Sequence, residues 1–318
     1  MKKIEGETER MHNKTFGVAI VTYNRLKLLK ECLESVSNQT ISFDKVVVVN
    51  NNSSDGTKEY LDSICKYNSS IVVIHAEENL GGAGGFSLAI KSLYKTVDYL
   101  LIIDDDAMLD KFFLQNILTH MSKDILAYSG TVETKEVIDT SHRRYLTNKI
   151  FMLKKDIPLK EYQKEYFDYD LSTFCGLLIN SDIVKKIGLP KSEYFIWYDD
   201  TEYSLRIRKY TKIRNINCAK INHKTNIDRS TKLSWKSYYG YRNAIDVGRR
   251  FSKNKFLYLL YRYLFHIIRF FQFKIGSIFV KKEREYKNKC AHMHLMILRD
   301  SLKKQLGKNE EYYAGYKL

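Results

Sequence analysis

The sequence predicts an α/β protein with a mostly parallel sheet and helices on both faces of that sheet. Two observations predict this class. Apolar runs and segments of helical periodicity alternate four times between residues 16 and 104, which is typical of βαβ units. The apolar runs also lack alternating polar residues, as expected of strands that are covered on both faces.

The first two strands are the clearest elements. Residues 16–22 (FGVAIVT) form a short β-rich apolar run, and residues 26–39 then carry apolar side chains at helical spacing. The second strand is expected at 45–50 (KVVVVN). The turn that follows it, NNSSDGT, leads into a helix for which Ser54 or Asp55 is the expected cap.

The next strands are expected at 71–76 (IVVIHA) and 99–104 (YLLIID), and a glycine loop, NLGGAGGF, lies between them and opens a helix. Ligands of such sheets bind beyond the carboxyl ends of the strands. Four polar clusters fall at these ends and are expected to meet along one edge: residues 22–25, 50–56, 79–86 and 104–107.

The second half is harder to interpret. Residues 133–170 are mixed and charged and support no assignment. A strand is expected at 174–180 and a short helix after it that ends at Gly188. Helical spacing returns in the second half of 194–210, and one or two final strands are expected within 213–223.

Composition limits the class of protein. The five cysteines are scattered and form no CxxC pair, which favours a reducing compartment without structural zinc or a disulfide framework. The polar segment 1–14 lacks the apolar core of a secretory signal. The net charge of +16 comes mostly from residues 231–318, which hold 20 Lys and Arg against 6 Asp and Glu. A basic region of this kind usually faces phosphate, in nucleic acid or in anionic lipid.

Within the basic region, residues 255–280 are rich in aromatic and aliphatic side chains. Lys255, Arg262, His266 and Arg269 fall on one helical face. The segment is too charged for a transmembrane helix, and we expect an amphipathic helix in the membrane interface with its basic residues toward anionic headgroups. The alternative is a helix whose apolar faces pack on the rest of the protein. No nucleic-acid recognition motif is present, so nucleic acid is not an expected partner.

Three adjacent carboxylates, Asp104, Asp105 and Asp106, end the fourth strand. Adjacent like charges repel, and burial strengthens the repulsion. Either the trio is a solvated turn, or a cation such as Mg²⁺ or Mn²⁺ binds there through carboxylate oxygens. Alternation along a strand would point Asp104 and Asp106 together and Asp105 away.

A second acidic cluster contains Asp199, Asp200 and Glu202 and follows Trp197. A partly desolvated carboxylate beside aromatic rings suits a general base, with a ring available to stack on a sugar. The alternative is a helix N-terminus at which the helix dipole favours acids. The glycine loop lacks the Lys-Ser/Thr ending of a P-loop, and its glycines permit either close approach to a ligand or tight packing.

The ordered set TYNR, NNNSSDGT, NLGGAGGF, IIDDDA, FCGLLI, WYDDTEYSLR and a late histidine resembles the family 2 inverting glycosyltransferases with the GT-A fold over residues 16 to 225. NLGGAGGF, DDDA and WYDDTEYSLR are most similar to the galactofuranosyltransferase branch. The rhamnosyltransferase branch shares much of this framework.

The resemblance implies a role for each matched residue. Asp200 is the implied catalytic base. The implied metal ligands are Asp104, Asp106 and His223. The implied nucleotide-sugar contacts are Thr22, Tyr23, Arg25, Asn50, Asp55, Asn79, Gly81, Gly82 and Asp105, with Asn50 and Asp55 near the uracil. The implied acceptor contacts are Trp197, Asp199 and Glu202.

The sequence is therefore expected to contain a polar tail (1–14), a GT-A catalytic domain (15–230) and a basic helical region (231–318). The expected activity is Mn²⁺- or Mg²⁺-dependent transfer of galactofuranose from UDP-galactofuranose to a hydroxyl of a glycan acceptor, which is expected to be lipid-linked. Transfer of rhamnose from dTDP-rhamnose is the alternative. Two further alternatives are weaker. One is a nucleotidyltransferase, which usually has a glycine-rich basic loop that TYNR lacks. The other is a non-catalytic module that binds polyanions or membranes. We expect the protein in the cytoplasm, on the inner face of the cell membrane. The sequence leaves open whether the protein forms a homo-oligomer.

Overall fold

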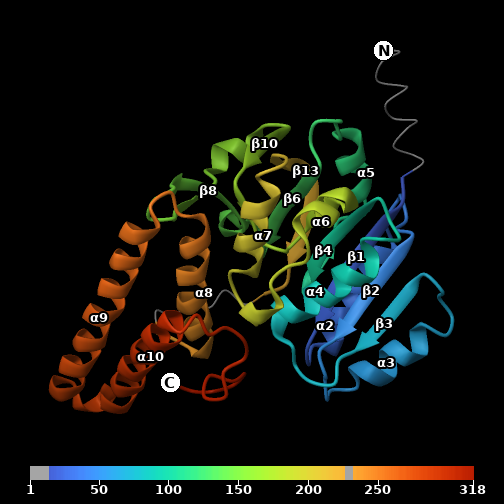
Figure 1. Ribbon diagram of the computed structural model, residues 1–318. Helices are drawn as coiled ribbons and strands as arrows, with labels where there is room; N and C mark the ends of the chain where they lie inside the picture. Colours follow the sequence, from blue (N-terminus) through green and yellow to red (C-terminus); the bar gives the residue numbers. More distant parts are fainter. Residues whose placement is uncertain (1–13, 226–231) are drawn as a thin grey trace.

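The computed structural model describes residues 14–225 and 232–318 (Figure 1). The predicted tail at 1–14 falls almost entirely outside the described residues, and so does the predicted boundary at residue 230. A large sheet forms the centre of the molecule, and its strand order is β10-β13-β6-β12-β4-β1-β2-β3.

Four strands at one side of this sheet are parallel, and all four were predicted within one residue. They are β1 (Phe16–Thr22), β2 (Lys45–Asn50), β3 (Ile71–His75) and β4 (Tyr99–Asp104). Side chains alternate between two separate cores, so that Ile20 packs into one core and Ala19 into the other. Burial of both faces explains why these strands read as continuous apolar runs.

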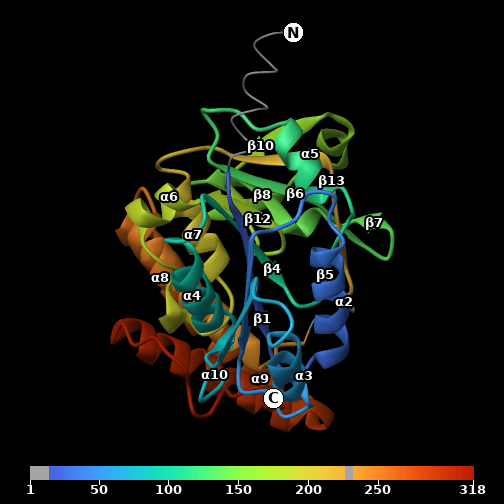
Figure 2. The ribbon, with the colours of Figure 1, turned by 90° about the vertical axis from the view of Figure 1, so that its right-hand side faces the viewer.

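Helices cover both faces, as predicted. Figure 2 shows α2 and α4 on opposite sides of β1. One face carries α2 (Leu26–Ser37) and α5 (Phe113–Thr119). The other face carries α4 (Gly81–Leu93), α6 (Ser181–Ile187) and α7 (Asp199–Ile207), and the short helix α3 (Thr57–Ile64) lies against β3.

The remaining strands are mixed in direction. In the large sheet, β12 (Leu177–Asn180) is antiparallel to its neighbours β4 and β6 (Ala127–Thr134), whereas β13 (Ile213–His223) is parallel to β6. The sheet also contains β5 (Ala107–Leu109), β7 (Val137–Ile138) and β10 (Tyr166–Tyr169). Residues 133–170, which the sequence left unassigned, hold several of the short strands of the structure.

A small second sheet consists of β8 (Arg143–Asn148), β9 (Leu153–Asp156) and β11 (Leu171–Ser172). Its strands are short and antiparallel, which explains why no long apolar run marked them. Short 3₁₀ turns complete the chain: η1 (Thr140–His142), η2 (Leu159–Gln163), η3 (Ser192–Tyr194) and η4 (Lys281–Glu283).

The C-terminal region is helical, as predicted. It consists of α8 (Trp235–Phe251), α9 (Lys255–Phe279) and α10 (Arg284–Leu302), and Figure 1 shows α9 farthest from the sheet. None of the described helices is long and apolar enough to cross a membrane. Helix α8 joins the C-terminal region to the rest of the protein, because its Tyr239 packs in one apolar cluster with Phe195.

The orientation of α9 corrects the sequence interpretation. His266 is fully buried beside His294 of α10, and Arg262 and Arg269 are half-buried on the same inward side. Three of the four residues of the predicted basic face therefore face α8 and α10 rather than solvent, and Lys255 at the start of the helix is exposed. Besides Lys255, Gln272 and Lys274, the exposed side chains of α9 are apolar: Phe256, Leu257, Leu260, Tyr261, Leu264, Ile267, Ile268, Phe271, Ile275, Ile278 and Phe279. The alternative, in which apolar faces of the helix pack on the rest of the protein, holds for Tyr258, Leu259 and Tyr263 but not for the exposed apolar side chains.

Candidate active site

The site lies where the strand order reverses. The chain runs from β1 outward to β2 and β3 and then returns to β4 on the other side of β1. Such a switch point leaves a crevice beyond the carboxyl ends of the two strands. Thr22, at the end of β1, donates its hydroxyl hydrogen to Asp105 Oδ2 at 2.7 Å, just after the end of β4. The polar clusters at 22–25 and 104–107, which were predicted to meet, therefore lie in contact.

A pocket of about 220 Å³, which we call the edge pocket, opens at this crevice. Eight of the predicted residues line it: Thr22, Tyr23, Arg25, Asn79, Gly81, Gly82, Asp104 and Asp105. Sequence reasoning did not single out the following lining residues: Val21, Asn51, Phe86, Phe195, Ile196, Trp235, Lys236 and Ala314. The last three belong to the C-terminal region, so no local motif could have indicated them.

The glycine loop contributes to this pocket in two different ways. Gly81 has a φ of +69°, and a Cβ there would lie 2.0 Å from the carbonyl oxygen of Phe195. Gly81 is therefore needed for the close approach of α4 to that segment. A Cβ on Gly82 would meet nothing within 4 Å, so Gly82 keeps the pocket wall open. Asn79 fixes the turn, because its side-chain oxygen accepts a hydrogen bond from Gly81 N at 2.8 Å.

The acidic trio is a connected cluster rather than a solvated turn. Asp105 and Asp106 are buried, and Arg25 Nη1 lies 3.2 Å from Asp105 Oδ1 and 2.7 Å from Asp106 Oδ2. The trio is not a continuous strand, because β4 ends at Asp104 and the next two residues form a turn. Asp104 and Asp106 nevertheless both approach His223, as predicted, whereas Asp105 accepts from Thr22. His223 Nε2, at the end of β13, lies 3.1 Å from Asp106 Oδ1.

The electrostatics of the cluster fit a divalent cation. Burial, together with the charge of Asp106, raises the pKa of Asp104 to about 7. Burial also raises the pKa of Asp105 to about 6, despite the opposing effect of Arg25. Although burial opposes it, the Asp106 hydrogen bond raises the pKa of His223. The three carboxylates therefore carry more negative charge than Arg25 and His223 neutralise.

The donor atoms indicate which cation would fit. Single ligand atoms of Asp104, Cys175 and His223 lie within 4.8 Å of one another, and His223 Nδ1 is buried without a hydrogen-bond partner among the described residues. Burial raises the pKa of the Cys175 thiol well above its usual range, so without a cation the thiol keeps its proton. The remaining donors are carboxylate oxygens, which suit Mg²⁺ or Mn²⁺, and one imidazole nitrogen. Cys175 was not predicted here.

Two predicted uracil contacts do not line the edge pocket. Asn50 is buried, its amide lies 3.1 Å from His75 Nδ1, and its side-chain oxygen accepts from Ser53 N at 3.0 Å. Asp55 accepts hydrogen bonds from Leu26 N and from Thr57. Both side chains fix the loops beside the pocket, and Asn51 takes the lining position. The predicted cap is also wrong, because α3 begins after Gly56 without a side-chain cap.

The second acidic cluster lies on a strained segment next to the edge pocket. Phe195, Trp197 and Tyr198 have φ angles of 64°, 64° and 70°. Non-glycine residues adopt such angles only where the surroundings hold them, at a cost of roughly 1–3 kcal/mol each. Asn243 of α8 supplies one restraint, because its amide group donates to the carbonyl oxygens of Tyr194, Ile196 and Trp197 at 2.9, 3.1 and 2.9 Å.

The three acids of this cluster have different environments. Burial, together with the adjacent Asp200, raises the pKa of Asp199 well above its usual range. Asp200 is less buried and accepts a hydrogen bond from Thr201 N, so it is the more available base. Glu202 is 0% exposed and ion-paired with Arg206 at 2.7 Å and Arg250 at 2.6 Å. Glu202 therefore joins α7 to α8 and is not open to an acceptor, contrary to its predicted role.

Trp197 is 46% exposed, and its ring lies against Gly240 of α8, where a Cβ would approach within 2.6 Å. The indole is therefore supported by α8 and partly open to solvent. Its predicted contact with the acceptor stays a prediction. The small residue in α8 that permits this packing could not be inferred from a local pattern.

The fold and this site define an α/β enzyme with a crevice at the switch point of its sheet, an acidic cluster at the edge of that crevice and a separate acid-bearing segment. A profile of the family described as "Glycosyl transferase family 2" matches residues 17–188, which is more than half of the chain. The chain belongs to this family, and it is a glycosyltransferase. Asp200 and His223 lie beyond the matched residues, so their assignment depends on the geometry above.

Two curated relatives and one solved structure are similar to this chain. The galactofuranosyltransferase GlfT1 of Mycolicibacterium smegmatis is 24% identical over 202 residues, 62% of this chain and 66% of that protein. The dTDP-rhamnosyl transferase RfbF of Shigella flexneri is 27% identical over 201 residues, 62% of this chain and 64% of that protein. The matches thus span just under two thirds of each relative.

A crystal structure of GalNAc-T7 with UDP, GalNAc and Mn²⁺ superposes with a TM-score of 0.64 at 16% identity, covering 91% of this chain and 57% of that one. At this identity the similarity shows the fold alone. It confirms the GT-A fold predicted from the ordered motifs.

Proposed function

We propose that this enzyme transfers galactofuranose from UDP-galactofuranose to a hydroxyl of a lipid-linked glycan, with inversion and with a divalent cation. The arrangement of the edge pocket carries the proposal: the acidic cluster with His223 borders one side, and the segment that bears Asp200 adjoins the other. The two relatives above divide between galactofuranosyl and rhamnosyl transfer. The motif NLGGAGGF with WYDDTEYSLR favours the first.

The proposed reaction is a single displacement. The Asp200 carboxylate takes the proton of the acceptor hydroxyl, whose oxygen forms a bond to the anomeric carbon. The bond from that carbon to the diphosphate breaks, and its electron pair leaves with UDP. Arg25 and Lys236 line the pocket and contribute positive charge for the diphosphate. One displacement inverts the anomeric centre, so no covalent enzyme intermediate is required.

Asp104, Asp106 and His223 would hold Mn²⁺ or Mg²⁺ at this edge. When bound, the cation supplies charge neutralisation for the departing diphosphate. Arg25 forms ion pairs with two of the carboxylates, Asp105 and Asp106, and so fixes their orientation. The Mn²⁺ bound in the GalNAc-T7 structure supports a divalent ion for the fold.

The exposed face of α9 supports a membrane location for the enzyme. Its apolar side chains form a continuous stripe, and α9 contains no acidic residue. Exposed lysines flank the stripe at positions 253, 255, 274, 281 and 282. An apolar stripe with a basic border complements an anionic bilayer, and two copies of so basic a region would repel each other. We therefore propose that the enzyme lies on the inner face of the cell membrane, with the apolar stripe of α9 toward the lipids.

A panel of donors tests the proposed activity. Hydrolysis and binding are measured with Mn²⁺ and UDP-galactofuranose, UDP-galactopyranose, UDP-glucose or dTDP-rhamnose. We expect selective turnover of UDP-galactofuranose. Preference for dTDP-rhamnose would move the enzyme to the rhamnosyl branch, and turnover of no donor would refute the proposed donor specificity.

Vesicle flotation tests the membrane proposal. Ile268→Asp places a charge in the stripe and should reduce binding to vesicles that contain phosphatidylglycerol. Leu302→Asp is the matched control, because Leu302 is an exposed leucine at the end of α10. Equal binding of both variants would contradict the proposal.

A further inference from the structure

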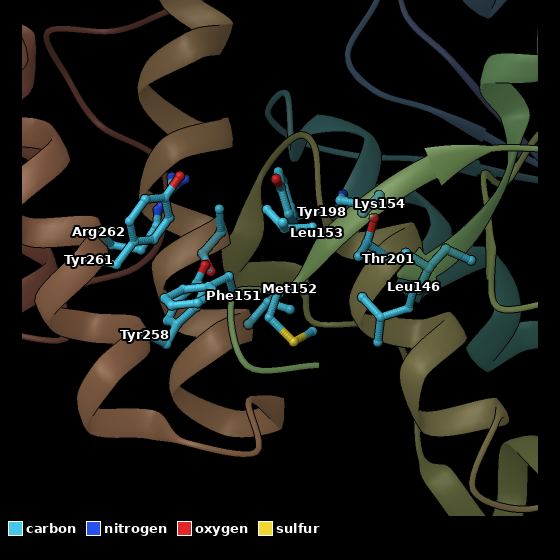
Figure 3. A pocket seen from close by; sticks show the side chains of 13 residues that line it. Leu146, Phe151, Met152, Leu153, Lys154, Tyr198, Thr201, Tyr258, Tyr261 and Arg262 are labelled. Carbon is cyan, nitrogen blue, oxygen red and sulfur yellow. Dashed lines mark hydrogen bonds between the residues drawn. The ribbon is translucent and has the colours of Figure 1, made fainter. Parts of the chain in front are cut away.

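A second pocket lies at the start of α7, the helix that carries Asp200. We call it the hairpin pocket, because the β8–β9 hairpin forms one wall (Figure 3). The start of α7 and the helices α8 and α9 form the rest. It has a volume of about 80 Å³ and shares no residue with the edge pocket. Its lining is Leu146, Phe151, Met152, Leu153, Lys154, Leu171, Tyr198, Thr201, Ala244, Val247, Tyr258, Tyr261 and Arg262.

The position of this pocket relates it to the reaction. Phe195 and Ile196 line the edge pocket, whereas Tyr198 and Thr201 line the hairpin pocket. Asp199 and Asp200 lie between Tyr198 and Thr201 in the chain, so the hairpin pocket adjoins the first turn of α7, which carries the candidate base. The edge pocket ends at the residues just before this turn. A molecule in the hairpin pocket would therefore lie beside the turn that bears the candidate base and outside the donor pocket.

The charge of the hairpin pocket is one-sided. Lys154 and Arg262 line it, and none of its thirteen lining residues is acidic. Lys154 Nζ lies 4.0 Å from the centre of the Tyr198 ring and 3.4 Å from Thr201 Oγ1. Arg262 stacks on Tyr241, and its Nε is shielded from solvent without a hydrogen-bond partner among the described residues. Two half-buried cations in one hollow favour an anionic ligand.

The pocket is also continuous with the apolar stripe of α9. Tyr261 lines the pocket and is 40% exposed as part of that stripe. Figure 3 shows Tyr261 and Arg262 together on α9, with Lys154 and Tyr198 across the pocket. A ligand with a phosphate in the pocket could therefore extend a long apolar chain along the helix, and its glycan would point toward Asp200.

We propose that the hairpin pocket binds the phosphate that joins the acceptor glycan to its lipid, through Lys154 and Arg262. This inference rests on the proposed transfer to a lipid-linked acceptor and adds the site at which that acceptor is held. The same phosphate chemistry could come from the acceptor or from the headgroups of surrounding lipids, so the test has to separate these two sources.

The test measures binding of the full-length chain to three kinds of phosphatidylcholine vesicle. The first kind contains no addition, the second contains a long-chain isoprenyl monophosphate, and the third contains phosphatidylglycerol at the same charge. The variants are Lys154→Gln and Arg262→Gln. The matched controls are Lys155→Gln, the exposed neighbour on β9, and Arg269→Gln, which lies two turns further along the same face of α9 and outside the pocket.

We expect each pocket variant to bind isoprenyl-phosphate vesicles about tenfold more weakly than the parent, which corresponds to the loss of one charge-assisted hydrogen bond. Both controls should bind nearly as the parent does. Arg262→Lys keeps the positive charge and should restore most of the binding. It also shows that any loss in Arg262→Gln does not come from misfolding, and thermal melting of every variant checks the fold directly.

Three results would overturn the proposal. One is unchanged binding of the pocket variants, and another is an equal loss in the controls. The third is an equal loss on phosphatidylglycerol vesicles, which would assign the two cations to general headgroup binding. Failure of the proposed function gives a different result, because the parent would then turn over no nucleotide sugar while these vesicle measurements kept their pattern.

Discussion

Asn243 provides a sharp test of how α8 shapes the site. Its amide group has two hydrogens and contacts three carbonyl oxygens of the strained segment, those of Tyr194, Ile196 and Trp197. Trp197 is half-exposed, so water can replace its bond, and the Tyr194 carbonyl keeps a second partner in Ile196 N at 2.7 Å. The Ile196 carbonyl would lose its partner. An unpaired buried carbonyl costs about 1–3 kcal/mol, so Asn243→Ala should reduce the free energy of unfolding by about 1–3 kcal/mol.

The same substitution should affect catalysis more than it affects donor binding. Without Asn243, the three positive φ angles lose a restraint, and Asp200 moves with the segment. A displacement of about 1 Å can cost roughly 100-fold in rate. UDP affinity should change much less, because Thr22, Arg25 and Asp105 are held by β1 and β4 and do not contact Asn243.

Asn215→Ala is the matched control. Asn215 is also a buried asparagine with several hydrogen bonds, but it lies on β13 and its partners are Ser129, Thr131, Arg143 and Asn217. Urea unfolding would compare the stability of the two variants, calorimetry their UDP affinity, and hydrolysis of the UDP-sugar their rates. If the two variants lose stability equally and also lose rate equally, Asn243 has no positioning role and the reasoning fails.

The remaining predictions concern charge. Asp200→Asn should keep UDP binding and lose transfer, and near-normal turnover would show that Asp200 is not the base; the exposed Asp182→Asn is its control. Asp106→Ala should weaken Mn²⁺-dependent UDP binding in calorimetry, and unchanged binding would remove it from the metal site. Burial, reinforced by nearby arginines, lowers the pKa of His266 strongly and that of His294 to about 4. The unfolded chain therefore binds more protons on these two histidines below a pKa of about 6.5, and the contribution of the pair to the free energy of unfolding should fall from pH 6.5 toward pH 4. The raised pKa values of Asp104 and Asp105 act in the opposite direction, so the parent is compared with a variant in which both histidines are replaced by Asn; a difference in urea midpoint that is independent of pH in this range would contradict this.

The parallel half of the fold could be predicted almost completely from the sequence. Its strands are buried on both faces, so continuous apolar runs such as KVVVVN mark them within one residue. The edge residues follow from the topology, because polar residues directly after such strands must meet at one edge. The sequence therefore predicts that Thr22, Arg25 and the acidic trio lie together, and in the structure Asp105 is hydrogen-bonded to Thr22 and ion-paired with Arg25.

The wrong predictions, for the face of α9 and for Glu202, have a common physical cause. Both features depend on contacts between distant parts of the chain. The helical periodicity of α9 was correct, but periodicity does not state which face is turned inward. His266 and His294 pair across two helices, and that contact turns the basic face inward. The sequence predicts that Glu202 contacts the acceptor, but in the structure Glu202 forms a buried ion pair with Arg250 of α8.

The C-terminal region therefore contributes to the candidate active site as well as to the proposed membrane contact. Trp235 and Lys236 line the edge pocket, Asn243 restrains the strained segment, and Arg250 holds Glu202 at the first turn of α7. All four residues belong to α8, which also packs against α9. Because one helix contacts the donor pocket, the acid-bearing segment and the helix with the exposed apolar stripe, the position of α9 is linked by direct packing to the position of Asp200. Removing residues 231–318 should consequently abolish donor hydrolysis in solution as well as membrane binding, an outcome that an independent anchor would not produce.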